Sequence, residues 1–251
     1  INHLFPGGEA LRDFSIKLKS DNRQMEISEL NFGAYDGTAE LTATVDFDSD
    51  FPTYWVDCNL DRVSLAKYFR RDNMEPWMEG NLFFRGQFVG VGLNHKGWQD
   101  RIQGEGDFMV TNGAFHRFNV HETIMAIDEF SNPRIALPDS TPFHDLRGNF
   151  FLRDGKFITD NLELYSRDLF IRSYGDISMN GFLNYRLDTF LSSEFSETVL
   201  SPMLGSAVPI QQGEQLGPVS LLLSGRSAKP DLQNLLRNFL PEDAFFSDGR
   251  R

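Results

Sequence analysis

The sequence contains a single cysteine, Cys58, which excludes an internal disulfide and a zinc site built from several thiolates. It also lacks any run of about 18 consecutive apolar residues, so it predicts no transmembrane helix. Basic residues are too few to balance the acidic ones: 24 Lys and Arg stand against 36 Asp and Glu, for a net charge of −12. Such a charge repels nucleic-acid phosphates and anionic bilayer surfaces, and it therefore disfavours a nucleic-acid-binding protein.

Aromatic side chains with a hydrogen-bonding group are scarce as well. The chain has 6 Tyr and 3 Trp but 24 Phe, which offers purely apolar surface. With 40% hydrophobic residues, the 251-residue chain can bury the core of one large domain or two small ones. The phenylalanines therefore predict either a Phe-rich core or an apolar groove.

Signatures of catalysis and metal binding are missing. The sequence has no Gly-x-Ser-x-Gly elbow, no Walker loop and no cysteine pair. His116 and His121 are five residues apart, which places them on opposite faces of a strand, and neither has a third ligand nearby. Asp46, Asp48 and Asp50 begin like a calcium loop, but phenylalanine occupies the sixth position, where the loop requires glycine. We therefore expect no enzyme, no metal site and no cofactor.

A recurrent Asx-Gly dipeptide separates short stretches of alternating hydrophobicity. The four dipeptides are Asp36-Gly37, Asn112-Gly113, Asp154-Gly155 and Asn180-Gly181. Asn, Asp and Gly tolerate the positive φ angles of a type I′ turn, so each dipeptide predicts a two-residue β-hairpin. The repeat therefore predicts an antiparallel meander, and we read one continuous β architecture.

These turns also fix which residues lie opposite one another. The predicted cross-strand pairs are Val110 with Phe115, Leu152 with Phe157 and Phe151 with Ile158. Because apolar side chains point to both sides of the second hairpin, we expect both faces of the sheet to be partly covered.

The remaining elements follow from periodicity. Alternation predicts strands at Asp13–Lys19, Glu40–Phe47, Tyr54–Leu60, Asn161–Tyr165, Leu169–Tyr174 and Phe182–Asp188. Helices are predicted at Ser64–Arg71 with Ser64 as N-cap, at His121–Phe130, and at Pro230–Leu240 with one apolar face.

Several of these units match a known pattern. The Asp154-Gly155 hairpin is followed by the strand Leu162-x-Leu164, then by Gly175-x-Ile177 and by Leu187-Asp188. Together with the units at 104–115 and 217–230, this succession resembles the C-terminal region of the AsmA-like family of Gram-negative envelope proteins. The resemblance is clearest over residues 82–230. We therefore divide the chain into an AsmA-like β region, residues 1–230, and a C-terminal helix with a frayed tail, residues 231–251.

The resemblance implies a fold and a function. It implies a mainly β protein whose antiparallel meander forms a curved, partly open sheet or incomplete barrel with a few short helices. The concave face would be an apolar trough for phospholipid acyl chains. The chain would then be a periplasmic fragment of a bridge-like lipid-transfer protein in outer-membrane biogenesis. The parent protein would be anchored in the inner membrane and would meet components of both membranes.

The candidate lipid-binding face consists of apolar residues that share one side of a hairpin or strand. These residues are Phe108, Val110, Phe115, Phe150, Leu152, Phe157, Leu162, Leu164, Leu169 and Ile171. The same residues also suit an ordinary packed core, as in a closed β-sandwich that binds carbohydrate or protein. Convergence of Trp55, Trp77 and Trp98 on one flat face would favour carbohydrate, whereas a hydrolase would require His116 and His144 in an acidic pocket.

Overall fold

The computed structural model describes residues 3–4, 11–48, 50–70, 75–92, 101–116, 119–120, 140–195, 216–226 and 229–234. Within these residues the chain forms one antiparallel sheet of thirteen strands, and each strand pairs with its neighbours in the sequence. The strands are β1 (His3–Leu4), β2 (Leu11–Ser20), β3 (Gln24–Ala34), β4 (Gly37–Asp46), β5 (Thr53–Ser64), β6 (Met78–Val91), β7 (Ile102–Phe115), β8 (Thr141–Arg153), β9 (Lys156–Tyr165), β10 (Leu169–Ser178), β11 (Phe182–Leu191), β12 (Leu216–Arg226) and β13 (Lys229–Asn234). The helices are α1 (Leu65–Arg70) and α3 (Ser193–Phe195). The predicted mainly β meander is confirmed.

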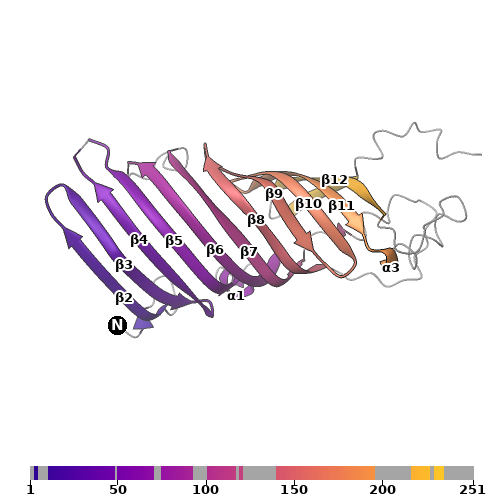
Figure 1. Cartoon of the computed structure of the whole chain (residues 1–251), viewed down its shortest axis with the longest axis horizontal. Helices are drawn as coiled ribbons and strands as arrows, with labels where there is room; N and C mark the ends of the chain where they lie inside the picture. Colours follow the sequence, from indigo (N-terminus) through magenta and orange to yellow (C-terminus); the bar gives the residue numbers. More distant parts are fainter. Residues whose placement is uncertain are drawn as a thin grey trace, which may run out of the picture.

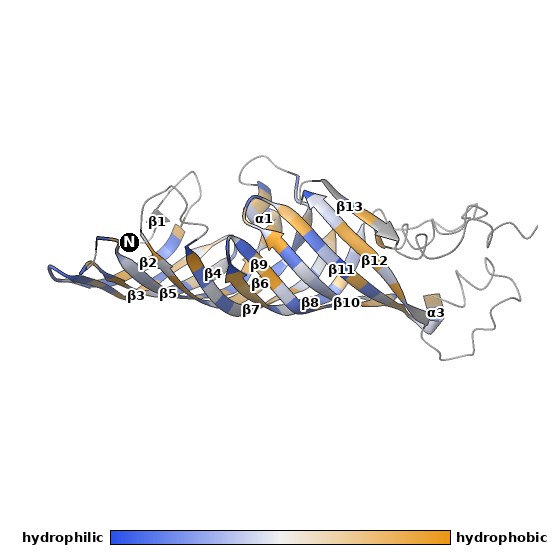
Figure 2. Cartoon of the chain, turned by 90° about the horizontal axis from the view of Figure 1, so that it is seen from above, coloured by the Kyte–Doolittle hydropathy of each residue, from blue (hydrophilic) through white to orange (hydrophobic). Residues whose placement is uncertain are grey.

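The sheet is long, curved and open. Figure 1 shows the strands side by side along the long axis of the molecule, from β2 at one end to β12 at the other. Seen from above, the sheet runs nearly straight through its N-terminal strands and curls through β9 to β13, toward the side on which α1 lies (Figure 2). Among the described strands, β1 and β13 form the two ends of the order and do not pair with each other. The predicted curved, partly open sheet is therefore confirmed.

The hairpin at Asp154-Gly155 has the predicted geometry. Both residues have positive φ angles, 52° and 67°, as a type I′ turn requires. The turn brings Leu152 opposite Phe157 and Phe151 opposite Ile158. The cross-strand pairs predicted for this hairpin are confirmed.

The hairpin predicted at Asn112-Gly113 is wrong. Both residues lie inside β7, where they stand opposite the single residue Gly80 of β6 and form a bulge. Val110 therefore pairs with Leu82 and Leu146 instead of Phe115. The physical reason is that a bulge uses the same left-handed backbone as a turn, here φ 52° at Asn112, so the dipeptide alone does not distinguish them.

The other two dipeptides mark turns, with shifted positions. Between β3 and β4 the residues of positive φ are Tyr35 and Asp36, so the turn begins one residue earlier than predicted. Between β10 and β11 the connection is the three-residue stretch 179–181, in which Gly181 takes φ 84°. Asx-Gly therefore located these hairpins, but it did not fix the position of the first turn or the length of the second loop.

The helix predictions have mixed outcomes. The helix after Ser64 is confirmed as α1, and the amide of Lys67 donates a hydrogen bond to Ser64 Oγ at 3.4 Å. The helix predicted from Pro230 is wrong up to Asn234, because Lys229–Asn234 forms β13 and pairs with β12. An edge strand tolerates proline, which lacks an amide hydrogen. Residues 235–251 and the helix predicted at 121–130 lie outside the described residues.

The two faces of the sheet differ in chemistry. We call the side toward which the sheet curls the inner face and the opposite side the outer face. Phe151 and Ile158 lie on the outer face, are 42% and 39% exposed and have no second layer of described residues over them, so the expectation that both faces are partly covered is wrong there. Figure 2 shows orange apolar and blue polar residues alternating along the strands. This alternation sends apolar side chains inward and most charged side chains outward.

Candidate functional site

The ten residues predicted for an apolar face all lie on the inner face, on β7 to β10. Seven of them are buried, whereas Phe108, Phe157 and Leu162 are partly exposed. The structure therefore brings together side chains whose relation between hairpins the sequence left open. Most of them belong to one cluster of packed apolar residues that continues onto β11 and β12.

Four phenylalanine rings form the middle of the inner face. Phe150 lies 5.4 Å from Phe84, 6.1 Å from Phe88 and 5.4 Å from Phe157, measured between ring centroids. The rings lie close to the backbone because glycines stand beneath them. A Cβ atom on Gly106 would come within 2.9 Å of the Phe150 ring and 2.1 Å of the Arg85 carbonyl oxygen. Glycine is therefore required there by close approach.

The curled part of the sheet encloses an apolar cavity of about 240 Å³. The cavity is lined by Trp77, Met78, Phe108, Phe115, Leu146, Leu162, Leu164, Ile171, Ser173, Ile177, Leu183, Tyr185, Leu187 and Leu223. None of these residues carries a charge. The volume is just below the range of about 300–1,000 Å³ that is typical of small-ligand sites.

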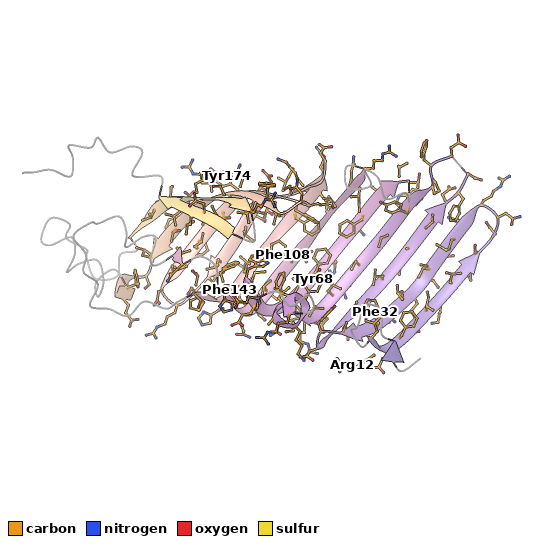
Figure 3. All side chains as sticks on the ribbon, turned by 180° about the vertical axis from the view of Figure 1, so that it is seen from behind. Arg12, Phe32, Tyr68, Phe108, Phe143 and Tyr174 are labelled. Carbon is orange, nitrogen blue, oxygen red and sulfur yellow. The ribbon has the colours of Figure 1, made fainter. Side chains whose placement is uncertain are left out.

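A line of aromatic rings limits one edge of the inner face. Phe69 of α1 packs 5.5 Å from Trp77, and Trp77 stacks 6.1 Å from Phe115 at the end of β7. Tyr68 of α1 continues the line, 5.5 Å from Tyr35 in the turn after β3. Figure 3, which looks onto the side of the sheet that carries α1, labels Tyr68, Phe108 and Phe143 in this region.

The N-terminal half of the inner face is apolar, and its large side chains are partly exposed except for Val45, which is buried. Its members include Ile16, Leu18, Leu30, Phe32, Leu41, Val45, Val56, Leu60, Phe84 and Phe88. Ile16 and Leu18 are 46% and 50% exposed, although both point to the apolar side. The described chain forms one sheet, and α1 packs on β5 and β6 at the edge of this half. A closed β-sandwich is therefore wrong, and no second layer of described residues covers the inner face along β2 to β5.

The outer face carries charges and ion pairs. Arg147 lies 3.0 Å from Glu163, and Lys156 lies 3.1 Å from Asp176. The hydroxyl of Tyr165 and the guanidinium of Arg147 lower the pKa of the Glu163 carboxyl below its usual value. A hollow of about 800 Å³ on this side is lined mainly by polar residues. In the part of the chain that the structure describes, no group of three or more His, Cys, Asp or Glu could hold a metal ion.

A carbohydrate site would depend on the tryptophans, and a hydrolase would depend on the histidines. Trp55 is exposed on the outer face, whereas Trp77 packs on the inner side, and Trp98 is outside the described residues. A single flat tryptophan surface for carbohydrate is therefore not formed by Trp55 and Trp77. His116 Nε2 lies 3.3 Å from the Glu79 carboxylate, and His144 is exposed on β8. The absence of enzymatic activity stays a prediction.

Sequence reasoning missed the N-terminal half of the inner face. The signal was present, because strict alternation predicts the strands around Ile16, Leu41 and Val56. Alternation within each strand does not show which of its two sides lies on the same face of the sheet as a given side of the neighbouring strand. The register of β3 with β4 and of β4 with β5 supplies that link, since it places Leu30, Leu41 and Cys58 in one row.

Comparisons with known proteins identify the family. Among the described helices, none has the length and apolar character needed to cross a bilayer. The family model described as the AsmA family matches residues 8–162, which is more than half of the chain. This match begins well before residue 82, where the resemblance seen in the sequence is clearest, and it ends within β9. No curated protein and no solved structure gives a significant match. The chain belongs to the AsmA family.

Proposed function

We propose that this chain carries phospholipid acyl chains along its inner face, as a fragment of a bridge-like lipid-transfer protein. The observation that carries the proposal is the continuous apolar inner face, which has no second layer of described residues over β2 to β5 and leads into the cavity of the curled part. A monomeric soluble protein rarely exposes a contiguous apolar patch of large size unless the patch binds something.

The physical chemistry of the inner face suits acyl chains. Each buried methylene group stabilises a bound chain by about 0.8 kcal/mol, so binding needs no polar recognition along the chain. The charged outer face remains in water, and a lipid head group can stay at the open side of the inner face. Transport of this kind requires no catalytic group and no cofactor, which agrees with the proposal that the chain is not an enzyme.

The cellular setting is part of the same proposal. The chain acts in the periplasm, the parent protein is anchored in the inner membrane, and lipid moves between the inner and outer membranes during outer-membrane biogenesis. Its partners are phospholipid and components of both membranes. Membership of the AsmA family supports this setting.

Titration with a fluorescent acyl probe tests the binding proposal. We expect saturable binding that phospholipid displaces and that does not weaken when the salt concentration is raised, because the inner face binds through apolar contacts. Absence of saturable binding would contradict the proposal. Binding that weakens strongly with salt would also contradict it, since that result would locate the probe on the charged outer face.

A further inference from the structure

Three hydroxyl side chains interrupt the apolar inner face at the curled end. Thr159 lies on β9, Ser173 on β10 and Tyr185 on β11, and Gly175 pairs with both Thr159 and Tyr185. Ser173 pairs with Leu162 on one side and Leu187 on the other. The three hydroxyls therefore occupy neighbouring strands on the side that faces the cavity.

The Ser173 hydroxyl is buried without a partner. Thr159 Oγ1 and Tyr185 Oη lie 3.3 Å apart and form a hydrogen bond with each other. Ser173 is only 4% exposed, and its Oγ has no hydrogen-bond partner in the structure. A buried hydroxyl that is left unsatisfied destabilises the free protein, because it has lost its hydrogen bonds to water. Ser173 lines the cavity of about 240 Å³, and its short side chain can change rotamer, so the hydroxyl can turn toward a molecule inside the cavity that supplies the missing partner.

The residues that line the cavity determine whether a bound molecule can be charged. None of the fourteen lining residues is charged, so a carboxylate or phosphate inside would be desolvated without a counter-ion. Burial raises the pKa of Tyr185, which keeps its hydroxyl protonated. Two hydroxyls share one hydrogen bond in the Thr159–Tyr185 pair, so that pair retains one donor hydrogen, and Ser173 offers another. The hydroxyls of Ser173, Thr159 and Tyr185 are therefore suited to a ligand that carries a neutral hydrogen-bond acceptor.

We infer that this cavity binds an acyl chain as a neutral ester, with the Ser173 hydroxyl donating a hydrogen bond to the ester carbonyl oxygen. The inference rests on the proposed function and adds the chemical class of the ligand group held at this end of the inner face. The hydrocarbon part of the chain contacts the apolar lining, and the charged parts of the lipid stay outside the cavity.

The test compares a fatty-acid methyl ester with an alkane of equal chain length, in calorimetric titrations of the whole chain. The unmodified protein should bind the ester more tightly than the alkane. Ser173→Ala should weaken ester binding about two- to tenfold, the range expected for one neutral hydrogen bond, and leave alkane binding unchanged. Thr189→Val is the matched control, because Thr189 Oγ1 is also buried without a partner but does not line the cavity. It should change neither affinity.

Each other outcome would overturn the inference in a distinguishable way. Equal ester binding by the protein and by Ser173→Ala would show that the carbonyl does not contact Ser173, as when water fills the cavity. A loss of stability in Ser173→Ala would show that Ser173 has a protein partner, which also contradicts the inference. Binding of both ligands with no preference for the ester would overturn the inference alone. Binding of neither ligand would overturn the proposed function itself.

Discussion

Replacement of Leu41 by aspartate is expected to weaken binding of the acyl probe at least tenfold while the chain stays folded. Leu41 lies on the inner face of β4, between Leu30 of β3 and Cys58 of β5, and it is partly exposed. A carboxylate at this position would have to be desolvated by a bound acyl chain, at a cost of several kcal/mol. In the free protein the same carboxylate remains in contact with water, so the effect on folding should be small.

Thr42→Asp is the matched control for this experiment. Thr42 is the next residue of the same strand, and its side chain is exposed on the outer face. Probe titration combined with circular dichroism should show normal binding and a normal fold. Equal loss of binding in both variants would contradict the assignment of the inner face. Unfolding of Leu41→Asp alone would mean that Leu41 belongs to a packed core instead of an open surface.

Replacement of Phe150 by alanine is expected to lower the free energy of unfolding by about 3–5 kcal/mol, as for other buried phenylalanines. Phe150 is 3% exposed and touches the rings of Phe84, Phe88 and Phe157, so its removal leaves a cavity at the centre of the sheet. Urea denaturation, followed by tryptophan fluorescence and by circular dichroism, measures the change.

Phe151→Ala provides the control on the opposite face. Phe151 is the neighbouring residue of β8, but it is 42% exposed on the outer face, so its truncation should change stability much less than that of Phe150, by about 1 kcal/mol or less. Similar losses in the two variants would show that both faces of β8 are packed. A negligible loss for Phe150→Ala would contradict the role of the phenylalanine cluster as the centre of the fold.

Much of the fold was accessible to sequence reasoning because period-2 alternation is a local property. Alternation predicts the strands around Ile16, Leu41 and Val56, and the turn chemistry of Asp154-Gly155, which is equally local, predicts that hairpin with its register. The local sequence is insufficient to predict the structure where two structural motifs, such as a β-turn and a β-bulge, use the same backbone conformation. Asn112-Gly113 suits a bulge as well as a turn, and the local sequence does not reveal that Gly80 lies opposite it.

The helix predicted from Pro230 failed for a related reason. Its apolar spacing suits one face of a helix, but β12 offers an unpaired edge, and Lys229–Asn234 uses it as β13. Pairing with a strand outside the local window therefore overrode the local preference.

The openness of the inner face could not be predicted from residue types. Apolar residues on alternate positions suit a packed core and an open trough equally well, and the structure contains both. Leu152 is buried near the Phe cluster, whereas Leu18 lies on the same face and is half exposed. The difference accompanies the curl of the C-terminal strands (Figure 2), and the twist of a sheet accumulates over many strands instead of being set by the local sequence. Leu41 is therefore a better site than Leu152 for testing an exposed trough.

The most direct test of the central claim is to identify lipid that co-purifies with the chain. The claim is that the apolar inner face accepts acyl chains because the described protein leaves it open. Native mass spectrometry and organic extraction of the chain purified from a Gram-negative host should reveal bound phospholipid, and Leu41→Asp should carry less of it than Thr42→Asp. Protein free of lipid that also fails to take up the acyl probe would contradict the account.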